Sequence, residues 1–388
     1  MIDQKKRVLM LASVASMIDQ FNMPNIELLQ SMGYDVDVAC NFKEGNTCSK
    51  EVIHKLIKRL KAMNVGYFQI DFSREATNMS RHIKSYRQVY YLMKKNGYAF
   101  VHCHSPVGGV IGRLAGGSTH TKVIYTAHGF HFYKGAPLKN WLLYYPIEKF
   151  CSYVTDTLIT INKEDYDFAK EKMHAKHVEY VPGVGVDIEK FSPKADTEQN
   201  RKSIREELGI SDEEIFILSV GELNENKNHE LIIRVIAQMH DTLIHYAIAG
   251  QGGKREYYEN LINELGVNKQ IHLLGYRSDI PQLDQSADVF AFPSLREGMG
   301  LAAIEALSAG TPVCGMNTRG TRECVINAKT GYLFDNNIES CEQALRRTIR
   351  RKDFMRRNCL EISNRYSCER VLSIMKSIYG EQTDKTRK

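Results

Sequence analysis

Two glutamates eight positions apart occupy the part of the sequence with the most chemical content. Glu297 and Glu305 lie in the segment SLREGMGLAAIEALSAGTPV, where a glycine-rich turn separates Glu297 from an apolar helical pattern. The start of a helix presents unpaired N–H groups and a partial positive charge, which suit a diphosphate. Eight residues cover at most about 12 Å of helix, comparable to the span from a ribose to a sugar across a diphosphate. One carboxylate could bind ribose hydroxyls and the other sugar hydroxyls. Alternatively, the two glutamates bind no ligand and only interact favourably with the helix dipole.

Histidines follow two strand patterns in the first half of the chain. His128 comes after the apolar run KVIYTA and precedes a glycine, and the imidazole pKa makes it a candidate proton carrier. A histidine that only completes the end of a strand is the alternative. His102 and His104 share one strand face by the period-two rule. A metal site would need a third ligand that the sequence does not supply.

Two DxD sequences formally match the motif that binds Mn or Mg in metal-dependent sugar transferases. Asp35-Val36-Asp37 lies inside a strand pattern, and Asp165-Tyr166-Asp167 lies in a helical stretch that begins near Asn162. Neither follows a strand on a loop where a diphosphate could meet it. We therefore expect no metal and no cofactor, with positive side chains and N–H groups in their place.

The whole chain alternates short apolar runs with helical patterns. Such alternation predicts parallel strands joined by crossover helices, and 388 residues exceed the roughly 250 at which one core stops growing. The predicted fold class is α/β, with two doubly wound Rossmann-like domains facing a central cleft. We expect an N-terminal acceptor-side domain over residues 1–190, a polar linker near 186–200 and a C-terminal nucleotide-sugar domain over 200–365. A helical stretch from about Phe354 to Tyr379 follows, and its tail at 366–388 is expected to pack back on the N-terminal domain.

The segment Ser294 to Val313 resembles the E-x7-E region of the retaining glycosyltransferases of family 4, which have the two-domain GT-B architecture, and the resemblance extends over essentially the whole chain. It implies that Glu305 binds the ribose and that Glu297 contacts hydroxyls of the donor sugar. It also implies that the backbone of three residues at the helix start cradles the distal phosphate, namely Met299, Gly300 and Leu301.

The segment VGELNENKN, which contains Gly221, resembles the family loop in which an arginine and a lysine neutralise the leaving diphosphate. Lys227 occupies the lysine position, whereas Glu222 stands where arginine is usual. A lost cation removes a charge-assisted contact. Two interpretations stay open: Asn226 or Asn228 compensates for the arginine, or the pocket depends on Lys227 alone.

Further contacts follow from the same resemblance. Gly250 in AGQGG is the glycine turn beside the nucleotide, and the backbone around Tyr276 and Arg277 touches the base. His128 is implied to contact the donor sugar or phosphate. His131, two residues further on, and His104 are candidates for lining the acceptor side.

The loop after the first strand, SVASMIDQFNMPN, lacks the paired glycines of many relatives and carries Ser13, Ser16 and Asp19 instead. We place Ser13 and Ser16 on the acceptor side. The sequence of this loop is similar to that of the family branch whose enzymes build bacterial exopolysaccharide or capsule.

Composition restricts the compartment and the partners. The sequence contains no apolar stretch near the roughly 18 residues of a membrane span, and its nine scattered cysteines indicate free thiols in a reducing compartment. Residues 50–100 hold eleven lysines and arginines against three acids. Such a patch attracts anionic lipid or a lipid-linked phosphate, although solvated helix faces would give the same count. We expect a cytoplasmic protein with peripheral contact to the inner face of the membrane and no nucleic-acid partner.

The predicted activity is retaining transfer of a hexose or N-acetylhexosamine from a nucleotide-sugar, with UDP as the expected nucleotide, to a glycan or polyprenyl-diphosphate-linked acceptor. Stabilisation of the departing diphosphate would supply most of the acceleration. Two alternatives stay open: a nucleotide-sugar 2-epimerase of the same architecture, and a non-catalytic nucleotide-sugar-binding protein, which the Glu222 departure favours.

Overall fold

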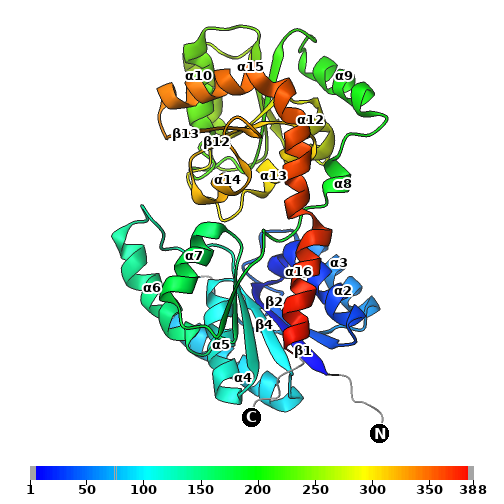
Figure 1. The fold of residues 1–388 in the computed structure, drawn as a ribbon, viewed down its shortest axis with the longest axis vertical. Coiled ribbons are helices and arrows are strands. Elements are labelled where there is room, and N and C mark those ends of the chain that lie inside the picture. Colours follow the sequence, from blue (N-terminus) through cyan, green and yellow to red (C-terminus); the bar gives the residue numbers. More distant parts are fainter. Residues whose placement is uncertain (1–5, 74, 76, 383–388) are drawn as a thin grey trace. The chain divides into compact units, whose positions relative to one another are not determined.

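The chain forms two compact units, each with its own parallel sheet (Figure 1). The computed structural model describes residues 6–73, 75 and 77–382. Unit 1 takes the chain up to Val184 and again from Val371, and unit 2 is Gly185–Arg370. Both sheets are parallel and have helices as crossovers, so the predicted class of two doubly wound α/β domains is confirmed.

Unit 1 contains a seven-stranded sheet of order β3-β2-β1-β4-β5-β6-β7. Its strands are β1 (Arg7–Val14), β2 (Asp35–Asn41), β3 (Gly66–Gln69), β4 (Phe100–His104), β5 (Lys122–Ala127), β6 (Thr157–Thr160) and β7 (His177–Tyr180). Its helices are α1 (Ala15–Phe21), α2 (Met23–Ser31), α3 (Lys50–Ala62), α4 (Met79–Asn96), α5 (Pro106–Thr119), α6 (Leu138–Ser152), α7 (Lys163–Lys172) and most of α16 (Cys368–Glu381).

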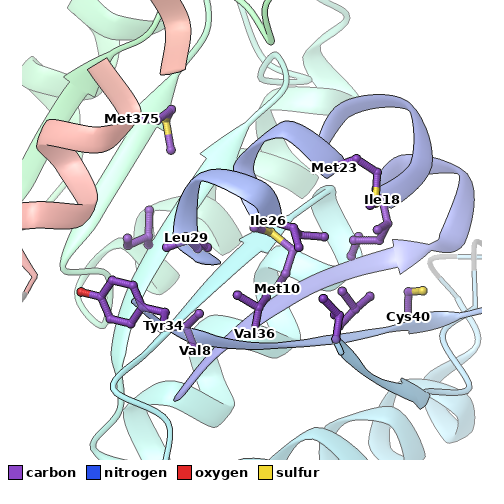
Figure 2. Close-up of a cluster of buried hydrophobic side chains, with 14 of the residues drawn as sticks. Val8, Met10, Ile18, Met23, Ile26, Leu29, Tyr34, Val36, Cys40 and Met375 are labelled. Carbon is purple, nitrogen blue, oxygen red and sulfur yellow. The ribbon is translucent and has the colours of Figure 1, made fainter. Parts of the chain in front are cut away.

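Strand β1 is buried on both faces, and its side chains alternate between two apolar clusters. Val8 and Met10 pack with residues of α1, α2 and α16 (Figure 2), whereas Leu9 and Leu11 belong to the cluster on the opposite face. The period-two alternation of a strand explains this division, and coverage of both faces explains why β1 is a continuous apolar run.

Helix α16 returns the end of the chain to unit 1. Met375 and Tyr379 join the cluster around β1, and the Tyr379 hydroxyl lies 2.8 Å from Nδ1 of His102. The predicted helical stretch from about Phe354 to Tyr379 has the wrong bounds. Helix α15 already begins at Ile338, and a short 3-10 turn separates it from α16.

Unit 2 contains a six-stranded sheet of order β10-β9-β8-β11-β12-β13. Its strands are β8 (Ile215–Val220), β9 (Ile244–Ala249), β10 (Ile271–Gly275), β11 (Val289–Phe292), β12 (Val313–Met316) and β13 (Gly331–Phe334). Its helices are α8 (Ile188–Phe191), α9 (Thr197–Leu208), α10 (His229–Met239), α11 (Arg255–Leu265), α12 (Ile280–Ser286), α13 (Leu301–Ser308), α14 (Arg319–Cys324) and α15 (Ile338–Ser363).

Two features of unit 2 were not expected from the sequence. The polar stretch interpreted as a linker contains α8, because Asp187 accepts a hydrogen bond from the backbone N–H of Lys190 and Phe191 is buried. Strand β13 is only four residues long and pairs with β12, so its local signal is weak.

The order of each sheet reverses at one point. In unit 1 the chain moves outwards in one direction from β1 and in the other from β4, and in unit 2 the same reversal falls between β8 and β11. Loops at the carboxyl ends of two such strands diverge and leave a crevice, which is where doubly wound sheets bind ligands. The fold therefore marks the loops after β1, β4, β8 and β11 as site positions.

Candidate functional site

A lysine and a glutamate meet at the reversal point of unit 2. Lys227 lies in the loop after β8 and Glu297 in the loop after β11, and their Nζ and Oε1 atoms are 2.7 Å apart. The side chains are 23% and 16% exposed, respectively, so the pair is only partly solvated. The structure thus brings together two residues, seventy positions apart, that the sequence analysis selected independently.

Hydrogen bonds hold the two loops in register. Asn226 donates through Nδ2 to the Arg296 carbonyl at 3.0 Å and accepts at its own carbonyl from the Leu295 N–H at 2.8 Å. The Lys227 N–H donates to Oδ1 of Asn224 at 3.0 Å. The lysine is consequently fixed at its backbone, and its ammonium group can change partners without loop movement.

Two glycines permit the close approach of neighbouring strand ends. A Cβ atom at Gly250 would lie 1.9 Å from the carbonyl oxygen of Gly221, and one at Gly221 would lie 3.2 Å from the side chain of Lys227. Any side chain at Gly250 would push the β8 loop away. These glycines therefore shape the floor beneath Lys227, which is a more specific role than the general glycine turn expected from AGQGG.

Helix α13 begins at the reversal point directly after Glu297. Gly300 is the N-cap residue and has a φ of 75°, a left-handed conformation that favours glycine. Met299 is buried, and Leu301 is the first helical residue. The first helical hydrogen bonds are those that Ala303 and Ile304 donate to the Gly300 carbonyl at 3.0 and 3.2 Å. The N–H groups of Leu301 and Ala302 precede them, so the helix start offers donors a few residues after Glu297, the partner of Lys227. Their role as a phosphate cradle stays a prediction.

Helix α13 also carries Glu305, one turn further on. Burial raises the pKa of Glu305 to about 7, and the charge of Lys190 opposes this shift in part. The carboxyl group therefore changes charge near neutral pH, where it can accept or donate a hydrogen bond to a sugar hydroxyl.

The sequence analysis missed Asp284, which lies on α12. Its side chain is fully buried, and neither carboxyl oxygen has a hydrogen-bond partner among the described residues. Burial first, and then the charge of Glu305, raise the pKa of Asp284 well above its usual value. The sequence of α12, IPQLDQS, gives no clear signal for this burial, because polar and apolar residues alternate irregularly along it and packing decides which of them are buried.

The remaining predicted nucleotide contacts lie on the surface of unit 2. Tyr276 is exposed, and the guanidinium of Arg277 is bound by Glu207 and Asp279. Contact of the backbone at these two residues with a base stays a prediction. Asn228 donates to Oδ1 of Asn336 at 3.3 Å.

Asn226 is likewise occupied by the loop contact to Arg296, and Glu222 is exposed. Compensation for the missing arginine therefore stays a prediction.

Three histidines of unit 1 are neighbours at the ends of β4 and β5. Nδ1 of His104 lies 3.1 Å from Nε2 of His128, and His102 lies between the hydroxyls of Tyr379 and Thr126 at 2.8 Å each. Burial lowers the pKa of His128 to about 4 and that of His102 to about 3, so both are neutral at neutral pH. His128 therefore acts as a neutral hydrogen-bonding group.

Two small cavities adjoin His128. One has about 20 Å³ and is lined by His102, His104 and Asn25; Nε2 of His104 and Oδ1 of Asn25 have no partner among the described residues. The other has about 110 Å³ and includes His131, whose ring centroid is 4.6 Å from that of Tyr144.

Ser13 and Ser16 are buried and used within unit 1. The Ser13 hydroxyl lies 2.6 Å from that of Ser105 and accepts from the Gly108 N–H at 2.9 Å. Ser16 bonds through its N–H to Asn46 at 3.0 Å. These bonds join the loops after β1, β4 and β2, and contact with an acceptor stays a prediction for both serines.

The DxD sequences have structural partners. Asp37 accepts from the Tyr98 hydroxyl at 2.7 Å, and Asp165 accepts from the Phe130 N–H at 2.9 Å. Across residues 6–73, 75 and 77–382, no group of three or more His, Cys, Asp or Glu side chains is arranged to hold a metal ion. Metal independence stays a prediction.

A groove of about 850 Å³ lies between the β2–α3 loop and β3 in unit 1. Phe42, Ile57 and Tyr67 supply apolar lining, and Lys43 and Lys50 supply positive charge.

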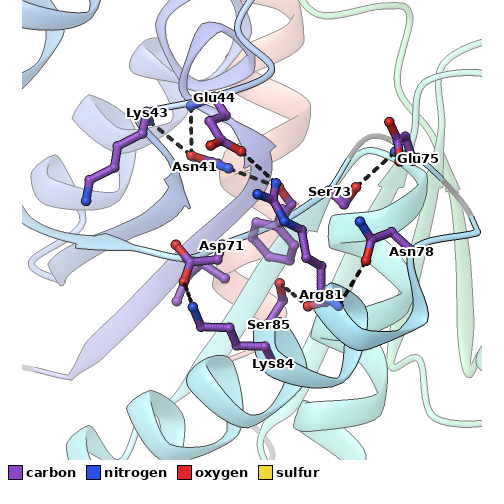
Figure 3. Close-up of polar contacts among 12 residues, drawn as sticks. Asn41, Lys43, Glu44, Asp71, Ser73, Glu75, Asn78, Arg81, Lys84 and Ser85 are labelled. Atoms are coloured by element: carbon purple, nitrogen blue, oxygen red, sulfur yellow. Dashed lines mark hydrogen bonds and ion pairs between the residues drawn. The ribbon is translucent and has the colours of Figure 1, made fainter.

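Part of the basic stretch beside the groove is neutralised, because Arg81 pairs with Glu44 at 2.6 Å and Lys84 with Asp71 at 2.7 Å (Figure 3). Counting charges in the sequence therefore overstates the positive surface of α4.

All nine cysteines are free thiols, as the sequence predicts. Within the described parts of the chain, none of the helices combines the length and hydrophobicity needed to cross a bilayer.

In comparisons with known proteins, both units match families of glycosyltransferases. The family described as Glycosyl transferases group 1 matches residues 200–363, and Glycosyl transferase 4-like matches residues 7–162. A relative from Bacillus subtilis (strain 168), named as glycosyltransferase EpsD, is 37% identical over 84% of this chain and 83% of its own.

A relative from Escherichia coli, UDP-Gal:alpha-D-GlcNAc-diphosphoundecaprenol alpha-1,3-galactosyltransferase, is 29% identical over 95% of each chain. The solved structure of HepE from Anabaena in complex with UDP and glucose covers 97% of this chain and 100% of its own, with a TM-score of 0.75 at 16% identity. None of these relatives is named as an epimerase or as a non-catalytic sensor, so those two alternatives gain no support. The chain therefore belongs to the family 4 glycosyltransferases of GT-B fold and is a sugar-transferring enzyme.

Proposed function

We propose that this enzyme transfers a hexose or N-acetylhexosamine from a UDP-sugar to a polyprenyl-diphosphate-linked glycan, with retention of the anomeric configuration, during synthesis of a bacterial surface polysaccharide. The observation that carries the donor half is the Lys227–Glu297 pair at the reversal point of unit 2. A cation beside a helix start suits a diphosphate, and a carboxylate beside that cation suits the sugar attached to it.

The chemistry follows from the charges of unit 2. As the bond between the anomeric carbon and the β-phosphate oxygen breaks, negative charge develops on the departing UDP. Lys227 and the N–H groups at the start of α13 stabilise this charge, and Glu297, released from Lys227, binds hydroxyls of the donor sugar. Glu305 binds the ribose. The acceptor hydroxyl attacks from the face that UDP leaves, and the diphosphate oxygen takes its proton.

The acceptor half rests on unit 1 and on the relatives. The name of the Escherichia coli relative specifies a UDP-sugar donor and a diphosphoundecaprenol-linked acceptor. In unit 1 the groove beside α3 joins apolar side chains with Lys43 and Lys50, which matches a lipid carrying a diphosphate. Ser13, Ser16, His104 and His131 stay candidates for the acceptor side, and neutral His128 for the donor sugar.

The place of action follows from the proposed acceptor. A polyprenyl-linked substrate lies in the membrane, so we propose that the enzyme works in the cytoplasm as a peripheral protein on the inner face of the cell membrane. Anionic head groups there attract basic surface.

Incubation of the purified chain with individual UDP-sugars and a short-chain prenyl-diphosphate-GlcNAc acceptor tests the proposal. Release of UDP together with a product heavier by one sugar, retained at the anomeric carbon by NMR, is the expected result. Isomerised donor in the absence of acceptor would instead support the epimerase alternative. Intact donor with every acceptor, despite measurable UDP-sugar binding, would support a binding protein.

A further inference from the structure

Helix α6 carries the densest group of exposed apolar side chains in the described structure. Of fifteen exposed large hydrophobic residues, six lie between positions 138 and 153. We call them the α6 outer face; they are Leu138, Leu142, Leu143, Ile147, Phe150 and Tyr153. Figure 1 shows α6 at the margin of unit 1. Contiguous apolar surface of this kind marks an interaction site.

The opposite side of α6 already anchors the helix. Trp141, Tyr144 and Tyr145 pack in the cluster on that side of the sheet, and the Trp141 ring lies 5.6 Å from Phe132 and 5.8 Å from Phe168. The outer face is therefore not needed to hold α6 on the domain.

From the sequence, the residues Trp141–Tyr145 could rest on a membrane or belong to the core of the first domain, and the core is the favoured interpretation. That interpretation is wrong for Leu142 and Leu143, which are exposed. Helical periodicity turns Trp141, Tyr144 and Tyr145 inwards and leaves these two leucines outside.

The exposed charges of the segment that carries the outer face, residues 131–155, are positive. Lys134 and Lys139 are exposed, Lys149 is partly exposed, and Glu148 is the only acid between residues 131 and 155. Glu148 is buried and bound to Arg113 at 2.8 Å, so it presents no negative charge to the outside. The helix offers an apolar stripe with a basic margin, about 22 Å long at 1.5 Å per residue.

We propose that the α6 outer face inserts into the head-group region of an anionic lipid bilayer. An amphipathic helix in this position buries its apolar side chains by roughly 5–10 Å while lysines contact anionic head groups. A second copy of the chain fits less well, because two such faces would bring their lysines together without carboxylates to pair with them. The inference deepens the proposed function and rests on it in one respect: the lipid-linked acceptor supplies the reason for membrane contact.

The experiment uses full-length protein and vesicles of phosphatidylcholine with or without phosphatidylglycerol. Binding of the wild-type protein to the vesicles that contain phosphatidylglycerol, measured by vesicle sedimentation, is the expected result.

The test variant is Leu142→Glu with Phe150→Glu, which places two carboxylates on the outer face. The matched control is Leu243→Glu with Phe354→Glu, because both of these apolar residues are exposed in unit 2 and the charge change is equal. We expect the test variant to lower vesicle partitioning at least about ten-fold, since each change removes a buried apolar side chain and adds repulsion. The control should partition like the wild type.

Two outcomes overturn the proposal: no binding of the wild type to anionic vesicles, or equal vesicle partitioning of the test and control variants. A wild-type dimer in sedimentation velocity that the test variant abolishes, without vesicle binding, would assign the face to a second copy. UDP affinity and transfer to a detergent-solubilised acceptor separate the two proposals. If the test variant keeps its UDP affinity and its transfer activity while neither it nor the wild type binds vesicles, only this inference fails. If the wild type binds vesicles but transfers no sugar from any donor, the proposed function fails.

Discussion

Substitution of Glu297 by glutamine should have opposite effects on nucleotide binding and on sugar transfer. Glu297 accepts a hydrogen bond from Lys227 at 2.7 Å, so a diphosphate that binds this lysine must compete with the carboxylate for the ammonium group. Glu297→Gln removes the competing charge and leaves Lys227 free for the nucleotide. The same change removes the carboxylate that we propose for the sugar hydroxyls.

The magnitude follows from the partial exposure of the pair. With side chains 23% and 16% exposed, the pair sits between surface and interior, and we assign it about 1 kcal/mol after solvent screening. Release of that energy should tighten UDP binding by about five-fold. Lys227→Met instead loses a charge-assisted hydrogen bond of about 1.5–3 kcal/mol and should weaken UDP roughly 10- to 150-fold.

Isothermal titration with UDP and steady-state transfer kinetics measure the two effects. For Glu297→Gln we expect a lower Kd for UDP together with kcat/KM reduced at least about ten-fold, because the lost contact acts on the transferring sugar. Weaker or unchanged UDP binding in Glu297→Gln, or unchanged binding in Lys227→Met, would refute the competition between carboxylate and diphosphate.

Three further predictions concern other parts of the site. His104→Asn places an amide near the position of Nδ1 and should keep the contact to His128. His104→Gln should lose this contact and lower kcat about five-fold at equal UDP affinity. Equal transfer rates for the two variants would contradict a positioning role of His104. Because burial raises the pKa of Glu305 to about 7 from 4.5, the folded state holds this proton more tightly, and stability falls as pH rises from about 4.5 to about 7. Glu305→Gln should therefore raise the melting temperature above that of the wild type at pH 8 but not at pH 4, while it weakens UDP binding, and a gain at both pH values would argue against ionisation as the cause. Gly250→Ala should destabilise unit 2 by about 1–3 kcal/mol in urea unfolding, since its Cβ would overlap a backbone carbonyl, whereas Gly253→Ala meets no atom within 4 Å and serves as the control.

Local patterns in the sequence were sufficient for the fold class. The run RVLMLAS predicted β1 because a strand buried on both faces must be apolar throughout, and the structure places β1 inside the sheet between β2 and β4. Strand β13 was missed, since its four residues acquire strand character only by pairing with β12. The short helix α8 was also missed, because its four residues carry no periodic pattern and one hydrogen bond accepted by Asp187 marks its start.

For the site, the sequence pointed to residue types and the structure supplied their partners. Lys227 and Glu297 were each selected from motifs, but their contact depends on the position of β11 next to β8, which local patterns do not encode. The unpartnered carboxyl of Asp284 and the exposure of Leu142 are likewise consequences of packing. Burial of a helix face is decided by its neighbours, so periodicity alone could not separate the two sides of α6.

A crystal structure of this chain with UDP tests the central claim most directly. We expect the β-phosphate within hydrogen-bonding distance of Lys227 Nζ and of the N–H groups at the start of α13, with the ribose on Glu305 and Glu297 no longer bound to Lys227. A nucleotide bound elsewhere, with the 2.7 Å contact between Lys227 and Glu297 intact, would contradict the account.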